Sequence, residues 1–290
     1  MKKLGRQTVQ FEKAPSIIGT ATIVGPKEGQ GRFKDYYDLI LKDSIYQERS
    51  WEKAETKILK ESVEMAIKNS KVPTAKIDYF IAGDLLNQII SAGFAARELG
   101  LPFLGIYGAC STIAQGAIIG AMIIDGDFGE NVVAAVSSHF CTAERQFRFP
   151  LELGNQRKPT SQWTVTGAGA MVLSAKAHNP RITRATVGKV IDMGEADPND
   201  MGTAMAPAAV DTIVRHFEDT GKTPDDYDLI LTGDLGSIGK DIAEELLRQK
   251  GYDISNKYTD CGVLIFYPEQ DVHAGASGCA CAAVVTCGYV

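Results

Sequence analysis

Asp78-Tyr79-Phe80-Ile81-Ala82-Gly83-Asp84-Leu85 is repeated 150 positions later as Asp228-Leu229-Ile230-Leu231-Thr232-Gly233-Asp234-Leu235 (234 − 84 = 150). A helical pattern and a Lys-x-Pro step precede each copy, and a second helical pattern follows each copy. A repeat of this length predicts two similar halves that pack together, with a site near the axis that relates them. We assign residues 1–175 to the first half and residues 176–290 to the second, and we expect them to form one packed unit.

Patterns typical of strands and helices alternate through both halves, which predicts an α/β fold in which mixed sheets enclose buried helices. Residues 111–124 are apolar nearly all round, so we expect a helix that is covered on every side. Residues 103–107 are predicted to form a buried strand. Further strands are predicted at residues 17–24, 78–82, 131–137, 169–174 and 229–232, and further helices at residues 51–69, 87–99, 209–219 and 241–250.

The repeat is incomplete. The first half continues into the predicted strands at 131–137 and 169–174, whereas the second half reaches Val290 without a counterpart of either strand. Either the second half is short or the chain is a truncated form, and we expect truncation at its C-terminus. Residues 138–166 are polar and too long for a plain connection, so we interpret them as a functional excursion that covers a site.

The composition excludes several classes of protein. With 44% hydrophobic and 23% charged residues, the chain resembles an ordinary globular protein, and its net charge of −6 without Lys/Arg runs argues against a nucleic-acid partner. No apolar segment follows the basic N-terminus, and the apolar stretch 113–124 is too short to span a bilayer. We therefore expect synthesis in the cytosol, without a signal peptide or a transmembrane helix. The six cysteines have no metal-binding or secreted spacing, and we expect no metal.

Cys110 is the candidate for chemistry. It lies in Gly108-Ala109-Cys110-Ser111-Thr112, where a predicted strand is followed by an apolar helix. Free N–H groups and the positive end of the helix dipole favour a thiolate there, which is how cysteine nucleophiles are activated. Alternatively, the cysteine is a small residue selected by a crowded turn. In the second half, Gly275-Ala276-Ser277 aligns with Gly108-Ala109-Cys110.

Two groups of motifs carry a family resemblance. The paired halves, the Cys110 motif and residues 166–173 (TGAGAMVL) resemble the thiolase and ketoacyl synthase superfamily. More narrowly, the chain resembles the stage V sporulation protein AD family of spore-forming bacteria from about residue 17 to residue 286. The motifs that carry this second resemblance are residues 83–88 (GDLLNQ), 137–139 (SSH), 142–148 (TAERQFR), 205–209 (MAPAA) and 277–281 (SGCAC). The resemblance implies a thiolase-like duplicated fold layered α-β-α-β-α, and a homodimer.

The resemblance also implies a catalytic set that this chain lacks. The superfamily pairs its cysteine with His and with His or Asn, which polarise a thioester carbonyl and hold an enolate. At the matching positions this sequence has Asp234 and Gly275-Ala276-Ser277. An ionised Asp234 would oppose thiolate formation at Cys110 by like-charge repulsion. We therefore interpret Cys110 as a vestigial nucleophile in a pocket kept for binding, with no cofactor, and His139 and His273 as hydrogen-bonded polar residues and not relocated bases.

The ligand also follows from the resemblance. It implies a protein that binds dipicolinic acid or its calcium chelate, and that acts with membrane-embedded subunits at the forespore or spore inner membrane. Arg145 and Arg148 would grip carboxylates, and Asp84 and Asp234 would offer oxygens to calcium. We expect the full set of ligand-binding residues to be Asp84, Asn87, Gln88, Cys110, His139, Arg145, Arg148, Asp234 and Ser277.

Other interpretations of these residues stay open. The two aspartates could cap turns, the two arginines could pair with Glu144 or Glu152, and Asn87 and Gln88 could cap a helix. Two other functions are also open: an acyltransferase that uses Cys110 on a coenzyme A thioester, and a structural scaffold with a vestigial pocket.

Overall fold

A six-stranded sheet forms the centre of the molecule. The computed structural model describes residues 2–148, 151–154 and 156–290, without the side chain of Glu152. The strand order is β4-β3-β9-β7-β5-β6, and β9 runs antiparallel to both of its neighbours. The strands span Ser16–Val24 (β3), Leu39–Ile40 (β4), Tyr79–Gly83 (β5), Phe103–Gly105 (β6), Asn131–Ser138 (β7) and Gly167–Ser174 (β9).

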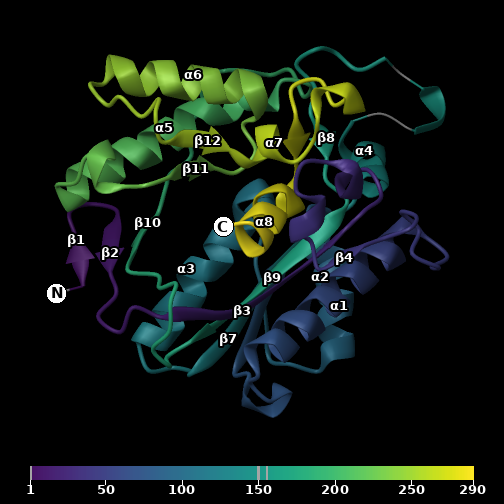
Figure 1. Ribbon diagram of the computed structural model, residues 1–290, viewed down its shortest axis with the longest axis horizontal. Helices are drawn as coiled ribbons and strands as arrows, with labels where there is room; N and C mark the ends of the chain where they lie inside the picture. The colour runs from purple at the N-terminus through teal and green to yellow at the C-terminus, as the bar shows by residue number, and fades with distance from the viewer. Residues whose placement is uncertain (1, 149–150, 155) are drawn as a thin grey trace.

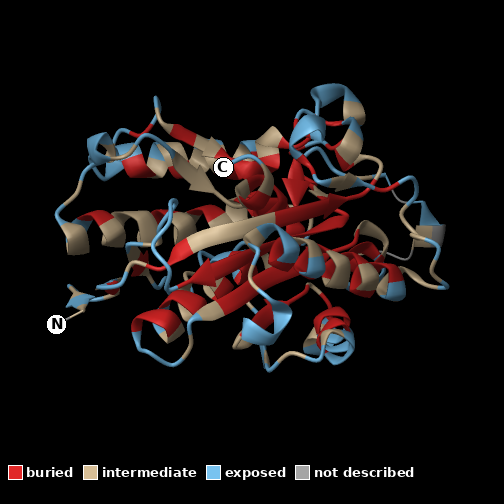
Figure 2. Cartoon of the chain, turned by 60° about the horizontal axis from the view of Figure 1, so that its bottom comes forward, coloured by how far each residue is buried: buried red, intermediate tan, exposed pale blue. Residues whose placement is uncertain are grey.

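Helices cover both faces of this sheet (Figure 1). On one face, α1 (Trp51–Ser70) and α2 (Ile90–Leu99) bury their apolar residues against the strands. On the other face lie α3 (Thr112–Asp125) and α8 (Cys279–Gly288). Because α8 consists almost entirely of small and β-branched apolar residues, it fits in the middle of the molecule, and Figure 2 shows the central strands buried between these layers.

The second half adds the outer layers. β11 (Ile230–Thr232) and β12 (Tyr258–Asp260) pair in parallel, and α5 (Met201–Thr220) and α6 (Gly236–Gln249) pack together with them. Leu231 of β11 packs against the core cluster that contains α8. The layers therefore follow the expected order α-β-α-β-α. The remaining elements are β1 (Lys3–Leu4), β2 (Thr8–Gln10), β8 (Trp163–Thr164), β10 (Arg184–Thr186), β13 (Ala276–Ser277), α4 (Phe140–Phe147) and α7 (Cys261–Leu264).

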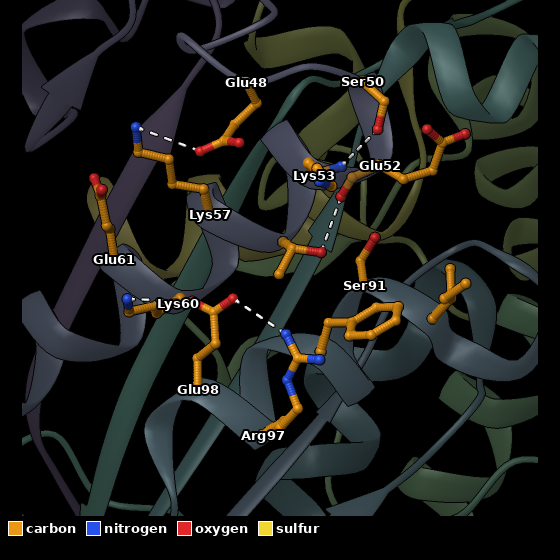
Figure 3. Close-up of a pocket in the computed structure, with 13 residues that line it drawn as sticks. Glu48, Ser50, Glu52, Lys53, Lys57, Lys60, Glu61, Ser91, Arg97 and Glu98 are labelled. Atoms are coloured by element: carbon orange, nitrogen blue, oxygen red, sulfur yellow. Dashed lines mark hydrogen bonds and ion pairs between the residues drawn. The ribbon is translucent and has the colours of Figure 1, made fainter.

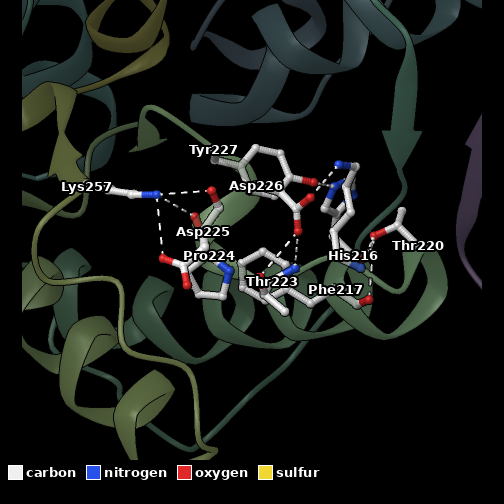
Figure 4. A network of polar contacts seen from close by, with 10 residues as sticks. His216, Phe217, Thr220, Thr223, Pro224, Asp225, Asp226, Tyr227 and Lys257 are labelled. Atoms are coloured by element: carbon white, nitrogen blue, oxygen red, sulfur yellow. Dashed lines mark hydrogen bonds and ion pairs between the residues drawn. The ribbon is translucent and has the colours of Figure 1, made fainter.

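The repeat is visible in the order of elements. α1 and α5 start 150 positions apart (201 − 51 = 150), and each is followed by a 3-10 turn, a strand, a helix and a second strand. In the second half, the Asp226 carboxylate accepts from the Thr223 N–H (2.8 Å) and fixes this turn (Figure 4). His216 of α5 joins the same network, because its ring contacts the Tyr227 hydroxyl at 2.7 Å. Within the described residues, the second half has no counterpart of β7 or β9.

Five elements differ from the sequence prediction. The helices predicted at 209–219 and 241–250 begin earlier, at Met201 (α5) and Gly236 (α6). The strand predicted at 103–107 is the three-residue edge strand β6, and Leu104 on it is 41% exposed. The helix predicted from residue 87 begins at Ile90, because Gln88 and the residue after it have left-handed backbone angles. The apolar helix α3 is not covered on every side by the described chain, because Met122 is 41% exposed. Neither a short apolar run nor the average hydrophobicity of a segment shows which other elements pack against it.

Candidate functional site

Cys110 lies at the turn between β6 and α3. The Thr112 hydroxyl donates to the Ala109 carbonyl (2.7 Å) and accepts from the Gly108 N–H (3.1 Å), and the Ser111 hydroxyl donates to the Gly108 carbonyl (2.8 Å). Ala109 has a left-handed φ of 46°, which turns the chain sharply before the helix. The half-buried Cys110 is thereby held two residues before α3, and the N–H groups of Ser111 and Thr112 already donate to the carbonyls of Gly108 and Ala109.

A cavity of about 230 Å³ opens beside Cys110. Residues of both halves contribute to its wall. The wall is largely apolar, and Arg148 supplies its positive charge. Besides Cys110, the side chains that matter for the argument are Leu85, Tyr107, Phe147, Arg148, Thr164 and Ser277.

Asp234 is the acidic neighbour of the sulfur. Its carboxylate accepts from the Ser277 hydroxyl (3.2 Å) and from the Gly278 N–H (2.9 Å). Gly278 has a φ of 94°, and a Cβ there would lie 2.9 Å from Thr164, so this turn requires glycine. The Asp234 carboxylate therefore accepts from the Gly278 N–H, which lies beside Cys110 and could otherwise donate to an oxyanion.

The electrostatics disfavour a thiolate. Burial, and next the charge of Asp234, raise the pKa of the Cys110 thiol well above its ordinary value. Burial also raises the pKa of Asp234, although its hydrogen bonds with Cys110 and Gly278 counteract part of this shift. At neutral pH the sulfur is consequently a neutral thiol, which is a weak nucleophile.

The described cavity wall holds no imidazole and no carboxamide. His139 is fully buried elsewhere: its Nδ1 accepts from the Cys141 N–H (3.2 Å), so its Nε2–H donates to the Ser44 carbonyl (2.7 Å). Burial lowers the pKa of His139. His273 lies 3.3 Å from the Asp271 carboxylate in a loop. Neither histidine lines the Cys110 cavity.

The candidates around β5 lie away from the cavity wall. Asp84 is fully buried, and its carboxylate accepts from the N–H groups of Leu86 (2.8 Å) and Ala92 (2.7 Å), contacts that favour the turn-capping interpretation. Asn87 and Gln88 are exposed in the 3-10 turn before α2. Their roles as ligands stay predictions.

Arg145 in α4 and Arg148 directly after α4 have different partners. Arg145 pairs with Glu52 of α1 and lies over the Trp51 ring, at 5.3 Å from the ring centroid. Arg148 lines the Cys110 cavity, where it pairs with Glu144 and donates to the Thr164 hydroxyl (3.3 Å). The alternative partner Glu152 has its side chain outside the described part of the chain. The structure thus brings Arg148, but not Arg145, together with Cys110, Asp234 and Ser277.

Comparison with known proteins identifies the family. The model of the stage V sporulation protein AD family matches residues 5–290. Stage V sporulation protein AD of Bacillus subtilis (strain 168) is 46% identical over 290 residues, which are 100% of this chain and 86% of that protein. The chain belongs to the stage V sporulation protein AD family.

Solved structures place this family member among thiolase-like folds. An OleA variant from Xanthomonas campestris has a TM-score of 0.64 at 14% identity, over 98% of this chain and 90% of that one. The 3-oxoacyl-(acyl carrier protein) synthase III of Xanthomonas oryzae pv. oryzae has a TM-score of 0.61 at 16% identity, over 96% and 90% of the two chains. The corresponding enzyme of Aquifex aeolicus has a TM-score of 0.59 at 12% identity, over 94% and 89%. At these identities the likeness establishes the fold alone, which is thiolase-like.

Sequence reasoning missed several residues of the site in this family member. Tyr107, Phe147 and Thr164 line the Cys110 cavity, and the Gln162 amide donates to the Asp234 carbonyl (2.8 Å). Tyr107 directly precedes the Gly108-Ala109-Cys110 motif, and that adjacency was a usable signal. Thr164 and Gln162 lie in or beside the short strand β8 inside the excursion, where no periodic pattern marks them.

A larger cavity lies between α1 and α2, away from Cys110. It measures about 650 Å³, and charged side chains from both helices surround it (Figure 3). Its charges pair with one another: Lys57 with Glu48 (3.8 Å) and Lys60 with Glu98 (3.3 Å). Size alone therefore does not locate the chemistry of this family member.

Two further findings concern membranes and metals. Of the helices described, none is long and apolar enough to cross a lipid bilayer. In the same part of the chain, no group of three or more His, Cys, Asp and Glu side chains is arranged to hold a metal ion.

Proposed function

We propose that this chain is a non-catalytic binding protein for dipicolinic acid or its calcium chelate, and a subunit of the spore dipicolinate transport assembly. The observation that carries the proposal is the position of Asp234. Its carboxylate takes the Gly278 N–H and raises the pKa of Cys110, where an acyltransferase needs a thiolate and free donors. Membership in a sporulation family agrees with a role in the spore.

The cavity beside Cys110 suits a small flat dicarboxylate. At about 30 Å³ for each water molecule, 230 Å³ corresponds to roughly eight waters, which is room for one substituted aromatic ring. Arg148 offers a charged donor to one carboxylate, while Leu85, Tyr107 and Phe147 offer apolar surface to the ring. Calcium would arrive with the ligand, and Asp234, whose carboxylate accepts from the wall residue Ser277, could offer it a hard oxygen.

Isothermal titration tests this proposal with a matched pair of arginines. We expect saturable binding of dipicolinic acid, measured with and without calcium. Because Arg148 lines the cavity and Arg145 pairs with α1, Arg148→Gln should weaken binding about tenfold or more, and Arg145→Gln should leave it unchanged. A folded protein without saturable binding, or equal effects of the two substitutions, would overturn the proposal.

The alternative is an acyltransferase that uses Cys110 on a coenzyme A thioester. One observation favours it: Cys110 lines a cavity and lies two residues before a helix. Mass spectrometry after incubation with acetyl coenzyme A distinguishes the two functions. We expect an unmodified thiol because the pKa of Cys110 is raised, and an acyl adduct on Cys110 would favour the enzyme.

The partners of the protein are also part of the proposal. The unpaired edge of β6 carries the exposed Leu104, and Phe94 of the neighbouring α2 is exposed as well, so a second copy could extend the sheet. We expect a homodimer in sedimentation experiments, and a monomer at micromolar concentration would contradict the proposed dimer.

We also expect the protein at the forespore membrane with membrane-embedded subunits. Its recovery only in the soluble fraction of sporulating cells would count against that location.

A further inference from the structure

The positive charge at the Cys110 cavity is already compensated. Arg148 is the one charged side chain among the residues described on the cavity wall, and it forms an ion pair with Glu144 one helical turn before it. The two side chains are only 13% and 10% exposed, so water and salt screen the pair little. The same guanidinium nitrogen, Nη1, also donates to the Thr164 hydroxyl (3.3 Å). Arg148 therefore offers hydrogen bonds to a ligand, but little net positive charge.

The charges behind the wall do not change this balance in favour of an anion. The Asp234 carboxylate is 5% exposed and accepts from the wall residue Ser277 (3.2 Å). Arg157, whose charge acts on Arg148, forms an ion pair of its own with Asp271 (3.7 Å). Whether Asp234 is ionised or protonated, the charges described around the cavity therefore sum to zero or less.

Several hydrogen-bond donors of the wall are also in use. The Ser277 hydroxyl and the Gly278 N–H donate to Asp234. The Tyr107 hydroxyl donates to the Leu85 carbonyl (3.3 Å). A dianion that entered this largely apolar cavity would lose its water and would leave at least one carboxylate without a cation. Because burial of an unpaired charge is strongly unfavourable, the cavity disfavours a ligand with two negative charges.

We propose that the Cys110 cavity selects a ligand without net charge, so that it takes the neutral calcium chelate of dipicolinate in preference to the free dianion, and that Glu144 determines this specificity. Both carboxyl groups of dipicolinic acid are ionised near neutral pH, and one calcium ion cancels their charge. The carboxylate oxygens of the chelate can still accept from Arg148. This inference rests on the proposed function, because it concerns the ligand of the same cavity.

Isothermal titration of the full chain with three ligands tests the selection. The ligands are dipicolinate freed of calcium by a chelating resin, dipicolinate in excess calcium, and pyridine-2,6-dicarboxamide, which has a similar shape and no charge. We expect the chelate to bind about tenfold more tightly than the free dianion, since the chelate buries no unpaired charge. The diamide should bind about threefold more tightly than the free dianion, because it removes the charge without calcium. Calcium chloride alone provides the blank.

Glu144→Gln tests the role of the paired carboxylate. Glutamine keeps the length of the side chain and an oxygen that can accept from Arg148, but it removes the negative charge. We expect the affinity for the free dianion to rise about tenfold and that for the chelate to change less than about threefold. The matched control is Glu52→Gln, because Glu52 pairs with Arg145, which lies outside the cavity wall. This control should leave both affinities unchanged.

Three results would overturn the selection and leave the proposed function in place. They are free dianion that binds as tightly as the chelate, diamide that binds more weakly than the free dianion, and an unchanged preference for the chelate in a Glu144→Gln variant with the melting temperature of the unchanged protein. A folded protein that binds neither form of dipicolinate would remove the proposed function and this inference together. The comparison of ligands needs no variant, so it decides the question even if Glu144→Gln does not fold.

Discussion

Asp84 and Asp234 occupy equivalent positions in the two halves, and both are buried, yet their carboxylates have different partners. Asp84 accepts from N–H groups of its own turn and of the helix that follows, Leu86 and Ala92. Asp234 accepts from Ser277 and Gly278, which come from another part of the chain and lie at the Cys110 cavity. The Asp84 carboxylate holds its own turn together, and the Asp234 carboxylate contacts residues of the Cys110 cavity wall.

The difference depends on a third carboxylate. Asp260, at the end of β12, accepts from the N–H groups of Leu235 (2.9 Å), Gly236 (2.9 Å) and Gly262 (2.8 Å). It thereby satisfies the turn that follows Asp234, and Asp234 is left to face the cysteine. A repeated sequence motif preserves a turn, whereas the neighbouring acceptor decides whether the repeated side chain is structural or available to a site.

The largest expected effect is that of Asp260→Ala. This change leaves three buried backbone donors unsatisfied, each costing roughly 1–3 kcal/mol, so we expect the free energy of unfolding to fall by at least about 3 kcal/mol. Asp84→Ala leaves only the N–H groups of Leu86 and Ala92 unsatisfied, and it also removes a repulsion with Glu55. The free energy of unfolding should therefore fall less in this variant. Urea unfolding of the two variants makes the comparison, with Asp260→Asn as the milder variant if Asp260→Ala does not fold. A larger loss for Asp84→Ala would refute the division of roles.

The second effect concerns pH. Glu55 of α1 is fully buried, and burial followed by the charge of Asp84 raises its pKa. Because the folded pKa lies above the unfolded value of about 4.3, the folded state binds more protons, and the free energy of unfolding decreases as the pH rises above that value. One such group contributes a slope of at most about 1.4 kcal/mol per pH unit. Glu55→Gln should therefore flatten the decline, measured by urea unfolding from about pH 5 to about pH 8.

The control for this experiment lies on the same helix. Glu64 is on the exposed face of α1, and Glu64→Gln should leave the pH dependence of stability unchanged. The position equivalent to Glu55 in the second half is Met205, so Asp234 has no such acidic neighbour on α5. If the free energy of unfolding of Glu55→Gln decreased with pH as steeply as that of the unchanged protein, the Glu55–Asp84 pair would not account for the difference between Asp84 and Asp234.

Most of the fold could be predicted from the sequence, because its long elements have clear periods. The strands β3, β5, β7 and β9 and the helix α1 lie close to the predicted ranges, and the repeat predicted two sets of equivalent elements. Short elements such as β6 could not be predicted as well, since a run of three apolar residues does not show whether a strand lies inside a sheet or at its edge. The neighbours decide that, and they are distant in the sequence.

The site could be predicted only in part. The alignment of Cys110 with Ser277 follows from the similarity of their two segments, and the placement of Asp234 near the cysteine follows from the family resemblance. In the structure Asp234 accepts from Ser277 and raises the pKa of Cys110. The different directions of Arg145 and Arg148, three residues apart, follow from the acidic partners Glu52 and Glu144, and a single sequence does not show which partner is in reach. Gln162 carries no pattern because it lies in the irregular excursion, although it fixes the backbone of Asp234.

The smallest expected effect is on the reactivity of one sulfur. Asp234→Asn removes the charge that raises the pKa of Cys110, but an asparagine oxygen can still accept from the Gly278 N–H. A lower pKa means more thiolate at a given pH, so alkylation of Cys110 by iodoacetamide near pH 8 should accelerate about tenfold for each unit of change. Asp84→Asn is the matched substitution in the other half and should leave the rate unchanged, since Asp84 is not among the groups that shift the pKa of this thiol. Peptide mapping by mass spectrometry follows Cys110 separately from the other cysteines. Equal rates in the two variants would mean that burial alone raises the pKa of Cys110. The difference between Asp84 and Asp234 would then affect the stability of the fold and not the reactivity of the cysteine.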